Sequence, residues 1–94
     1  MLSKTHIGLE ECQTRSEFVR FLGTTNETLE SVLLKDIIEA AARFGVELER
    51  WADAIVTPDG SKGIGVGVLK RWRQGTVPSD AMRESTLTAL RSIL

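Results

Sequence analysis

Turn-forming residues divide this 94-residue chain into short segments, and this division restricts the possible folds more than any other feature of the sequence. Gly23, Gly45 and Gly75 each follow an apolar, helix-like segment and are natural places for a helix to end. The run Thr-Pro-Asp-Gly at 57–60 is a typical turn, because proline fixes φ and Asp-Gly tolerates left-handed geometry. The run Thr-Val-Pro-Ser at 76–79 breaks the chain again. Helices, most of them short, fit between these breaks.

Capping residues and apolar spacing predict the first two helices. Thr14 and Glu17 have the spacing of a capping box, so a short helix should follow them and stop at Gly23. Over residues 27–44, apolar side chains recur at three- and four-residue steps, which predicts the longest helix of the chain. Residues 1–13 show no such period, and we expect a loose arm there.

The second half of the chain contains two clear helical segments and one ambiguous segment. The apolar residues of 48–55 share one face of a helix, and Ser79 can cap a last helix that continues towards the end of the chain. Between them, residues 64–68 alternate valine or isoleucine with glycine, which is a strand period, whereas residues 69–74 have a helical pattern. Taken together, the segments predict an all-α fold, a compact bundle of about five short helices in one domain.

The charge is distributed unevenly along the chain. Residues 1–59 contain six Lys/Arg and eleven Asp/Glu, a net charge of −5, whereas residues 60–94 contain six and two, a net charge of +4; the sum is the overall −1. Small proteins often show such an imbalance by chance. A polarised protein can nevertheless present one basic face to an anionic partner.

Several classes of protein are not expected from the composition. The chain has one cysteine, Cys12, and one histidine, His6, so we expect neither an internal disulfide nor a zinc site, and no cofactor. These residues also provide no set of catalytic side chains, so we do not expect an enzyme. No apolar run approaches the roughly 18 residues of a membrane span, and the first residues lack the apolar region of a signal peptide. A cytoplasmic protein is the expectation.

The segment 63–75 concentrates the residues most suited to a binding function. Lys70, Arg71 and Arg73 surround Trp72, and no acidic residue lies between positions 60 and 78. Trp72 lies three residues after Leu69, so it is expected to be a core anchor rather than a surface for stacking bases. The basic residues can simply form a solvated face, but with no acid nearby we favour a contact with a negatively charged partner, most simply nucleic acid. The glycines of this segment do not have the spacing of a phosphate-binding loop.

The segment resembles the turn and recognition helix of the phage-repressor-type (Cro/Xre) helix-turn-helix family. The residues that carry this resemblance are Gly63, Ile64, Leu69, Trp72, Gly75 and Pro78. Upstream, residues 33–44 are similar to the family's first helix, 45–47 to its short joint and 48–55 to the first helix of the motif, with Ala52 where the two helices touch. Residues 79–94 are similar to the closing helix. The resemblance therefore implies that 27–94 is a helix-turn-helix domain, preceded by an arm and short helix in 1–26 that we regard as a candidate dimerisation or partner segment.

The resemblance also implies which residues contact DNA and which hold the motif together. The implied DNA-binding residues are Ser61, Lys62, Gly65, Val66, Gly67, Lys70, Arg71, Arg73 and Thr76. The implied structural residues are Ala52, Gly63, Leu69, Trp72 and Gly75. Two features depart from the family's pattern: residues 56–62 lengthen the turn, and residues 65–67, where the family usually reads bases, have no polar side chain. Direct readout would then depend on Lys70 and Arg71, with a contact from Val66 to a thymine methyl.

The sequence leads to two functional hypotheses. The first is a sequence-specific DNA-binding transcriptional regulator, a repressor of phage, plasmid or mobile-element type. It would bind double-stranded DNA as a homodimer, since one such unit contacts few base pairs. The alternative is a protein-binding inhibitor or anti-activator built on a helix-turn-helix-like scaffold, which the apolar 65–67 surface and the acidic first half favour.

Overall fold

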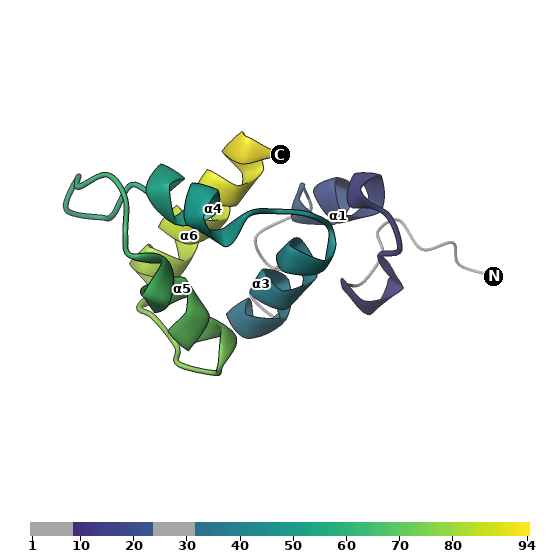
Figure 1. Ribbon diagram of the computed structural model, residues 1–94, viewed down its shortest axis with the longest axis horizontal. Helices are drawn as coiled ribbons and strands as arrows, with labels where there is room; N and C mark the ends of the chain where they lie inside the picture. The colour runs from purple at the N-terminus through teal and green to yellow at the C-terminus, as the bar shows by residue number, and fades with distance from the viewer. Residues whose placement is uncertain (1–8, 24–31) are drawn as a thin grey trace.

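The structure, a computed structural model, describes residues 9–23 and 32–94, and within them the chain is all-α (Figure 1). The elements in chain order are η1 (Leu9–Glu11, a 3-10 helix), α1 (Arg15–Leu22), α3 (Leu34–Arg43), α4 (Leu48–Ala54), α5 (Val66–Arg73) and α6 (Asp80–Ile93). The β-structure in this part of the chain is one isolated antiparallel bridge between Val56 and Lys62. The prediction of a small, compact all-α bundle of about five helices is confirmed.

Helix α1 begins and ends where its sequence signals predict. The backbone N–H of Glu17 donates to Thr14 Oγ1 (3.2 Å), and the backbone N–H of Thr14 donates to Glu17 Oε1 (3.1 Å), which is a complete capping box. Gly23 follows as the C-cap. The helix buries Phe18, Phe21 and Leu22, so its apolar face belongs to the core.

The longest predicted helix is wrong at its start. We expected a helix over 27–44, but α3 begins at Leu34, and Leu33 has an extended backbone (φ −69°, ψ 137°). The carbonyl of Val32 instead accepts a hydrogen bond from Arg83 Nη2 of α6, at 2.6 Å. Residues 24–31 of the prediction lie outside the described part of the chain. The end of the helix is as predicted, because Gly45 adopts φ 91°, in the left-handed region that favours glycine.

The segment before α1 is also more ordered than the expected loose arm. Within the described residues 9–13, η1 packs against α3, and the exposed fractions of Leu9 and Cys12 are only 8% and 3%. Arg43 Nη2 lies 3.5 Å from the Cys12 carbonyl oxygen as a hydrogen-bond donor. Residues 1–8 lie outside the described part.

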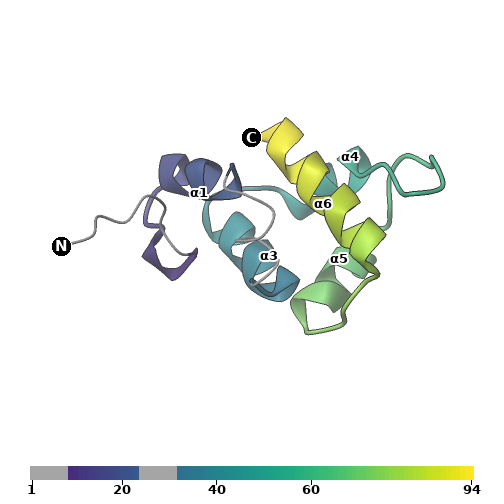
Figure 2. The ribbon, with the colours of Figure 1, turned by 180° about the vertical axis from the view of Figure 1, so that it is seen from behind.

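The helices share a single hydrophobic core. Helix α3 packs against α5, α4 packs against both α5 and α6, and α1 packs against α6 (Figures 1 and 2). Ring stacking between Phe18 and Phe44, with centroids 5.4 Å apart, joins the first helix to the end of α3. Trp51 is fully buried, and its Nε1 donates to the Thr86 carbonyl at 2.9 Å, which ties α4 to α6. Among the helices described here, none is long and apolar enough to cross a membrane.

Candidate nucleic-acid interface

Helix α5 resolves the ambiguous segment and has a buried and an exposed side. Residues 63–65 belong to no helix or strand and the helix begins at Val66, so the alternation at 64–68 does not mark a strand. Leu69 and Trp72 are buried against the other helices, as their spacing predicts, and Val66 and Val68 are half-buried against the same core. The core contacts therefore fix which side of α5 faces outward.

Lys70, Arg71 and Arg73 lie on the exposed side of α5. Within residues 9–23 and 32–94, none of the three takes part in an ion pair or a side-chain hydrogen bond. All three lie in the last turn of α5, where cations also interact favourably with the negative end of the helix dipole. The helix therefore presents a cluster of three basic side chains to solvent, with Lys70 and Arg71 turned away from the buried face and Arg73 at its edge.

The first turn of α5, called the bare turn below, contains Gly65 and Gly67 and no polar side chain. Gly65 is the N-cap residue and provides no side-chain cap, and Gly67 follows two positions later. A Cβ built on either glycine would meet no atom within 4 Å, so nothing in the described part of the molecule covers the backbone there. Val66 lies between them and is half-buried, so only part of its side chain can reach a thymine methyl or any other partner group. A partner can therefore approach the backbone closely at this end of α5.

The lengthened turn between α4 and α5 is closed at its base by backbone hydrogen bonds. The N–H of Gly63 donates to the Ile55 carbonyl (2.6 Å), and the N–H of Ile64 donates to the Ala52 carbonyl (3.0 Å). Together with the Val56–Lys62 bridge, these bonds make residues 56–62 a small hairpin that projects away from the helices (Figure 1). The chain thus returns to the end of α4 before α5 begins, and the two helices pack together.

Two small residues permit this closure. Ala52 is almost fully buried where α4 meets α5. Gly63 has φ 88°, which other residues rarely adopt, and a Cβ there would lie 3.6 Å from the Asp53 carbonyl oxygen. At the other end of α5, Gly75 is also left-handed, with φ 119°, and the N–H of Thr76 donates to the Arg71 carbonyl at 3.2 Å, which ends the helix. Thr76 itself is exposed beside the basic cluster.

The hairpin has its own polar network. The Thr57 hydroxyl donates to Asp59 Oδ1, and the Ser61 N–H donates to the same oxygen at 3.0 Å. These two hydrogen bonds lower the pKa of the fully exposed Asp59 carboxyl below its ordinary value, the Thr57 hydroxyl having the larger effect. Ser61 and Lys62 are exposed on the strand that leads back to α5, so Lys62 lies close in sequence and space to the start of that helix.

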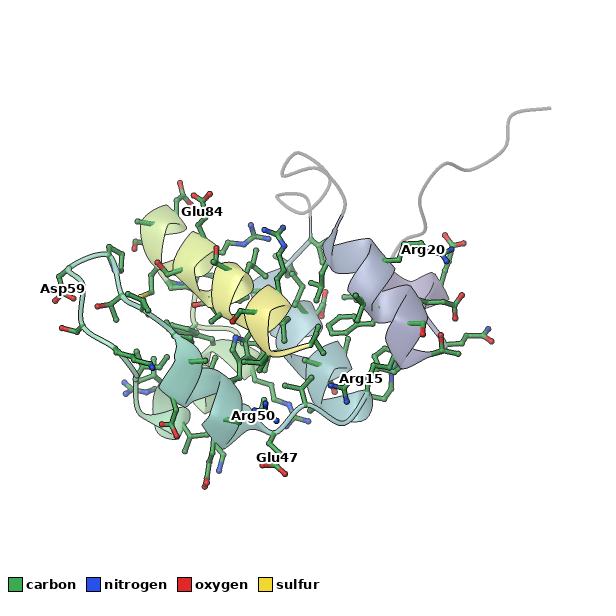
Figure 3. The ribbon with its side chains drawn as sticks, turned by 90° about the horizontal axis from the view of Figure 1, so that it is seen from above. Arg15, Arg20, Glu47, Arg50, Asp59 and Glu84 are labelled. Carbon is green, nitrogen blue, oxygen red and sulfur yellow. The ribbon has the colours of Figure 1, made fainter. Side chains whose placement is uncertain are left out.

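Acidic side chains on and beside α4 change the electrostatic surroundings of the basic cluster. Glu47, Glu49 and Asp53 are exposed on α4 together with Arg50, and α4 packs against α5. Figure 3 shows Glu47 and Arg50 pointing away from the bundle, into solvent. The expectation that no acid lies near the basic cluster covered only positions 60 to 78, although the amphipathic pattern of 48–55 already predicts these acids on the outer face of that helix. Phosphate groups near α4 would meet carboxylates there.

The comparisons with known proteins add no family. The chain matches no protein-family model, and no curated protein or solved structure is significantly similar to it. Across the described residues, no group of three or more His, Cys, Asp or Glu side chains could hold a metal ion. The residues that bear on function are therefore those of α4, the hairpin and α5.

Proposed function

We propose that this chain is a sequence-specific DNA-binding transcriptional regulator, a repressor of phage, plasmid or mobile-element type that acts in the cytoplasm. In this proposal α4 and α5 form a helix-turn-helix whose turn is lengthened by the 56–62 hairpin. The observation that supports it is the two-sided character of α5: Leu69 and Trp72 hold the helix, and three basic side chains project from its other side.

The proposed binding mode places α5 in the major groove of double-stranded DNA. This groove is about 12 Å wide and admits one α-helix. Lys70 and Arg71 would contact base edges and phosphates, and Arg73 would contact phosphates. The bare first turn at Gly65 and Gly67 would let the backbone approach the DNA closely, as the open space around both glycines allows. Ser61, Lys62 and Thr76 would contact the sugar-phosphate backbone beside the helix.

Because few polar side chains reach the bases in this arrangement, most of the affinity should come from phosphates. Each neutralised phosphate contributes about 0.9 to the slope of log affinity against log salt. Three to four basic contacts per subunit therefore predict a slope of roughly −3 per subunit. The acidic side chains of α4 would repel the backbone and restrict which orientations of the protein are allowed.

The test replaces Arg71 and Arg73 with alanine and measures duplex binding by fluorescence anisotropy, with the duplex selected from a random pool. Both side chains are exposed, so the double variant should keep its helical circular dichroism. We expect the affinity to fall by about 100-fold, as the loss of two charged contacts implies. The matched control removes two exposed charges elsewhere, with Arg20→Ala and Lys35→Ala, and should bind as the parent chain does. Equal binding by the Arg71/Arg73 variant and this control would refute the proposal.

The alternative, a protein-binding inhibitor or anti-activator, is favoured by two specific observations. The first turn of α5 has no hydrogen-bonding side chain, and three carboxylates are exposed on and beside α4, which packs against α5. A heparin column and a salt titration with random duplex separate the two proposals, because only a protein with phosphate contacts shows a steep salt dependence. A chain that elutes from heparin without added salt and binds no duplex would favour the protein partner.

A further inference from the structure

The outer side of α6 is uncovered and formed by small side chains. Figure 2 shows the helix crossing the outside of the molecule, with no other described helix over it. Small residues follow one another at steps of four, three and four, which keeps them on one strip of a helix. These residues are Ala81, Ser85, Thr88 and Ser92. Three of them are exposed and Ser85 is half-buried, so a second helix could approach α6 closely along this strip.

A groove lies beside this strip. It has a volume of about 420 Å³ and lies between the outer face of α6 and the base of the hairpin, where Val56 and Pro58 form its far wall. Val56 is 51% exposed, although it is a large aliphatic side chain. The groove is therefore apolar on the hairpin side and lined by small residues and Glu84 on the α6 side, which suits a helix that packs against α6.

The charged side chains along one edge of the strip have an order that is complementary to the same edge of an antiparallel second copy of α6. Asp80 and Glu84 lie near the start of α6 and Arg91 lies near its end, and their spacing of four and seven residues places all three on the same flank. All three side chains are exposed. Arg91 Nε donates to the Leu22 carbonyl at 2.8 Å, which holds the guanidinium at this edge.

We propose that the strip Ala81–Ser85–Thr88–Ser92 of α6 is a homodimer interface, occupied by the antiparallel α6 of a second copy of this chain. A twofold axis between positions 86 and 87 places Ser85 opposite Thr88 of the partner subunit and Ala81 opposite Ser92 of the partner subunit. Arg91 then lies between Asp80 of the partner subunit and Glu84 of the partner subunit. The twofold symmetry repeats this contact at the opposite end of the helix pair. The antiparallel direction also aligns the two helix dipoles favourably.

A parallel pairing lacks this complementarity, because it sets Asp80 and Glu84 against the same residues of the second copy. In the segment 1–26, where we had expected a dimer contact, the described helix α1 turns Phe18, Phe21 and Leu22 into the core of its own subunit, so these three residues are not available for such a contact. The α6 pairing does not require DNA, so its oligomeric test and the duplex-binding test can fail independently.

The first experiment measures the dimer dissociation constant of the full chain by sedimentation equilibrium, without DNA. Thr88→Arg places a long charged side chain in the middle of the strip, and Thr88 is exposed in the single subunit, so the variant should fold. We expect its dissociation constant to rise at least about tenfold, while Ser16→Arg, an exposed matched control on α1, should leave it unchanged. Glu84→Arg, which repels Arg91 of the partner subunit, should weaken the dimer too, whereas Glu39→Arg on α3 should not.

A parent chain that stays monomeric at about 1 mM would overturn the proposal and leave the groove for a different occupant, as would a folded Thr88→Arg variant that dimerises as tightly as the parent.

Disulfide trapping tests the direction of the pairing and does not depend on Thr88→Arg folding. Ala81→Cys and Ser92→Cys are made as separate chains, one of them with a size tag, and are mixed and oxidised. Cys12 is buried, so the parent chain should not cross-link and is the control. The antiparallel pairing predicts a product that joins one chain of each kind. Cross-links only between identical variants, or none above the level of the parent chain, would contradict it.

Discussion

Helices α1 and α5 have the same length, eight residues, but they begin in opposite ways. Helix α1 starts with a complete capping box, in which the Thr14 and Glu17 side chains satisfy backbone N–H groups. Helix α5 starts at Gly65, and no side chain caps it. Both helices turn apolar residues into the core, and both carry basic residues in their last turn.

The difference shows how each helix is specified. The start of α1 is encoded locally, within four consecutive residues. The start of α5 is set from outside, by the hydrogen bonds of Gly63 and Ile64 to the end of α4 and by the burial of Leu69. A helix that is held by its neighbours does not need a capping side chain, so its first turn can stay bare for a partner. The comparison therefore predicts that the stability of α5 depends on its packing, whereas the stability of α1 depends on its cap. It also predicts that a substitution in the bare turn of α5 can raise the stability of the protein.

The largest effect is expected for Leu69→Ala. Leu69 is fully buried, and its truncation removes the main packing contact of α5 and leaves a cavity, which should lower the free energy of unfolding by about 2–5 kcal/mol. That is a large fraction of the stability of a domain of this size. Urea denaturation followed by circular dichroism measures it. The neighbouring Lys70→Ala is the control, since an exposed side chain should change stability by less than about 0.5 kcal/mol. A Leu69→Ala chain as stable as Lys70→Ala would mean that packing does not hold α5.

A smaller effect is expected at the start of α1. Thr14→Ala removes the hydroxyl that accepts from the Glu17 N–H, so the free energy of unfolding should fall by about 1 kcal/mol. The same urea titration measures it. Thr14→Ser keeps the hydroxyl, so its free energy of unfolding should lie within about 0.3 kcal/mol of that of the parent chain. If the alanine and serine variants were equally stable, the capping box would not be what fixes the start of α1.

The same division explains what could be predicted from the sequence. The ends of α1 and the start of α6 followed from Thr14, Gly23 and Ser79, because each signal acts on backbone groups within a few residues. The start of α3 was missed because Val32 and Leu33 continue the apolar period of the helix. In the structure Leu33 is extended, and the carbonyl of Val32 accepts a hydrogen bond from Arg83, 51 residues further along the chain. Periodicity contains no information about such a distant contact.

The candidate site divides in the same way. The inward direction of Leu69 and Trp72, and hence the outward direction of Lys70 and Arg71, followed from helical spacing alone. The hydrogen bonds from Gly63 and Ile64 that close the hairpin did not, because they depend on how α4 packs against α5. The basic cluster and the exposed acids of the preceding helix were thus visible in the sequence, whereas the bonds that join the two helices were not.

The smallest effect, and the one that most sharpens the comparison, is a gain in stability from Gly67→Ala. Gly67 lies in the first turn of α5, its φ is not positive, and a Cβ there meets nothing within 4 Å, so alanine fits without strain. Alanine also reduces the freedom of the unfolded chain, and we expect the free energy of unfolding to rise by about 0.5 kcal/mol. If the bare turn lies against DNA, the same methyl group should weaken duplex binding in the anisotropy assay. Gly60→Ala is the contrasting variant: its site is equally open, but its φ of 93° makes alanine destabilising. A Gly67→Ala chain that is more stable and binds duplex as well as the parent would show that the bare turn is not a contact surface. The turn would then lack side chains only because neighbouring elements already hold the helix in place.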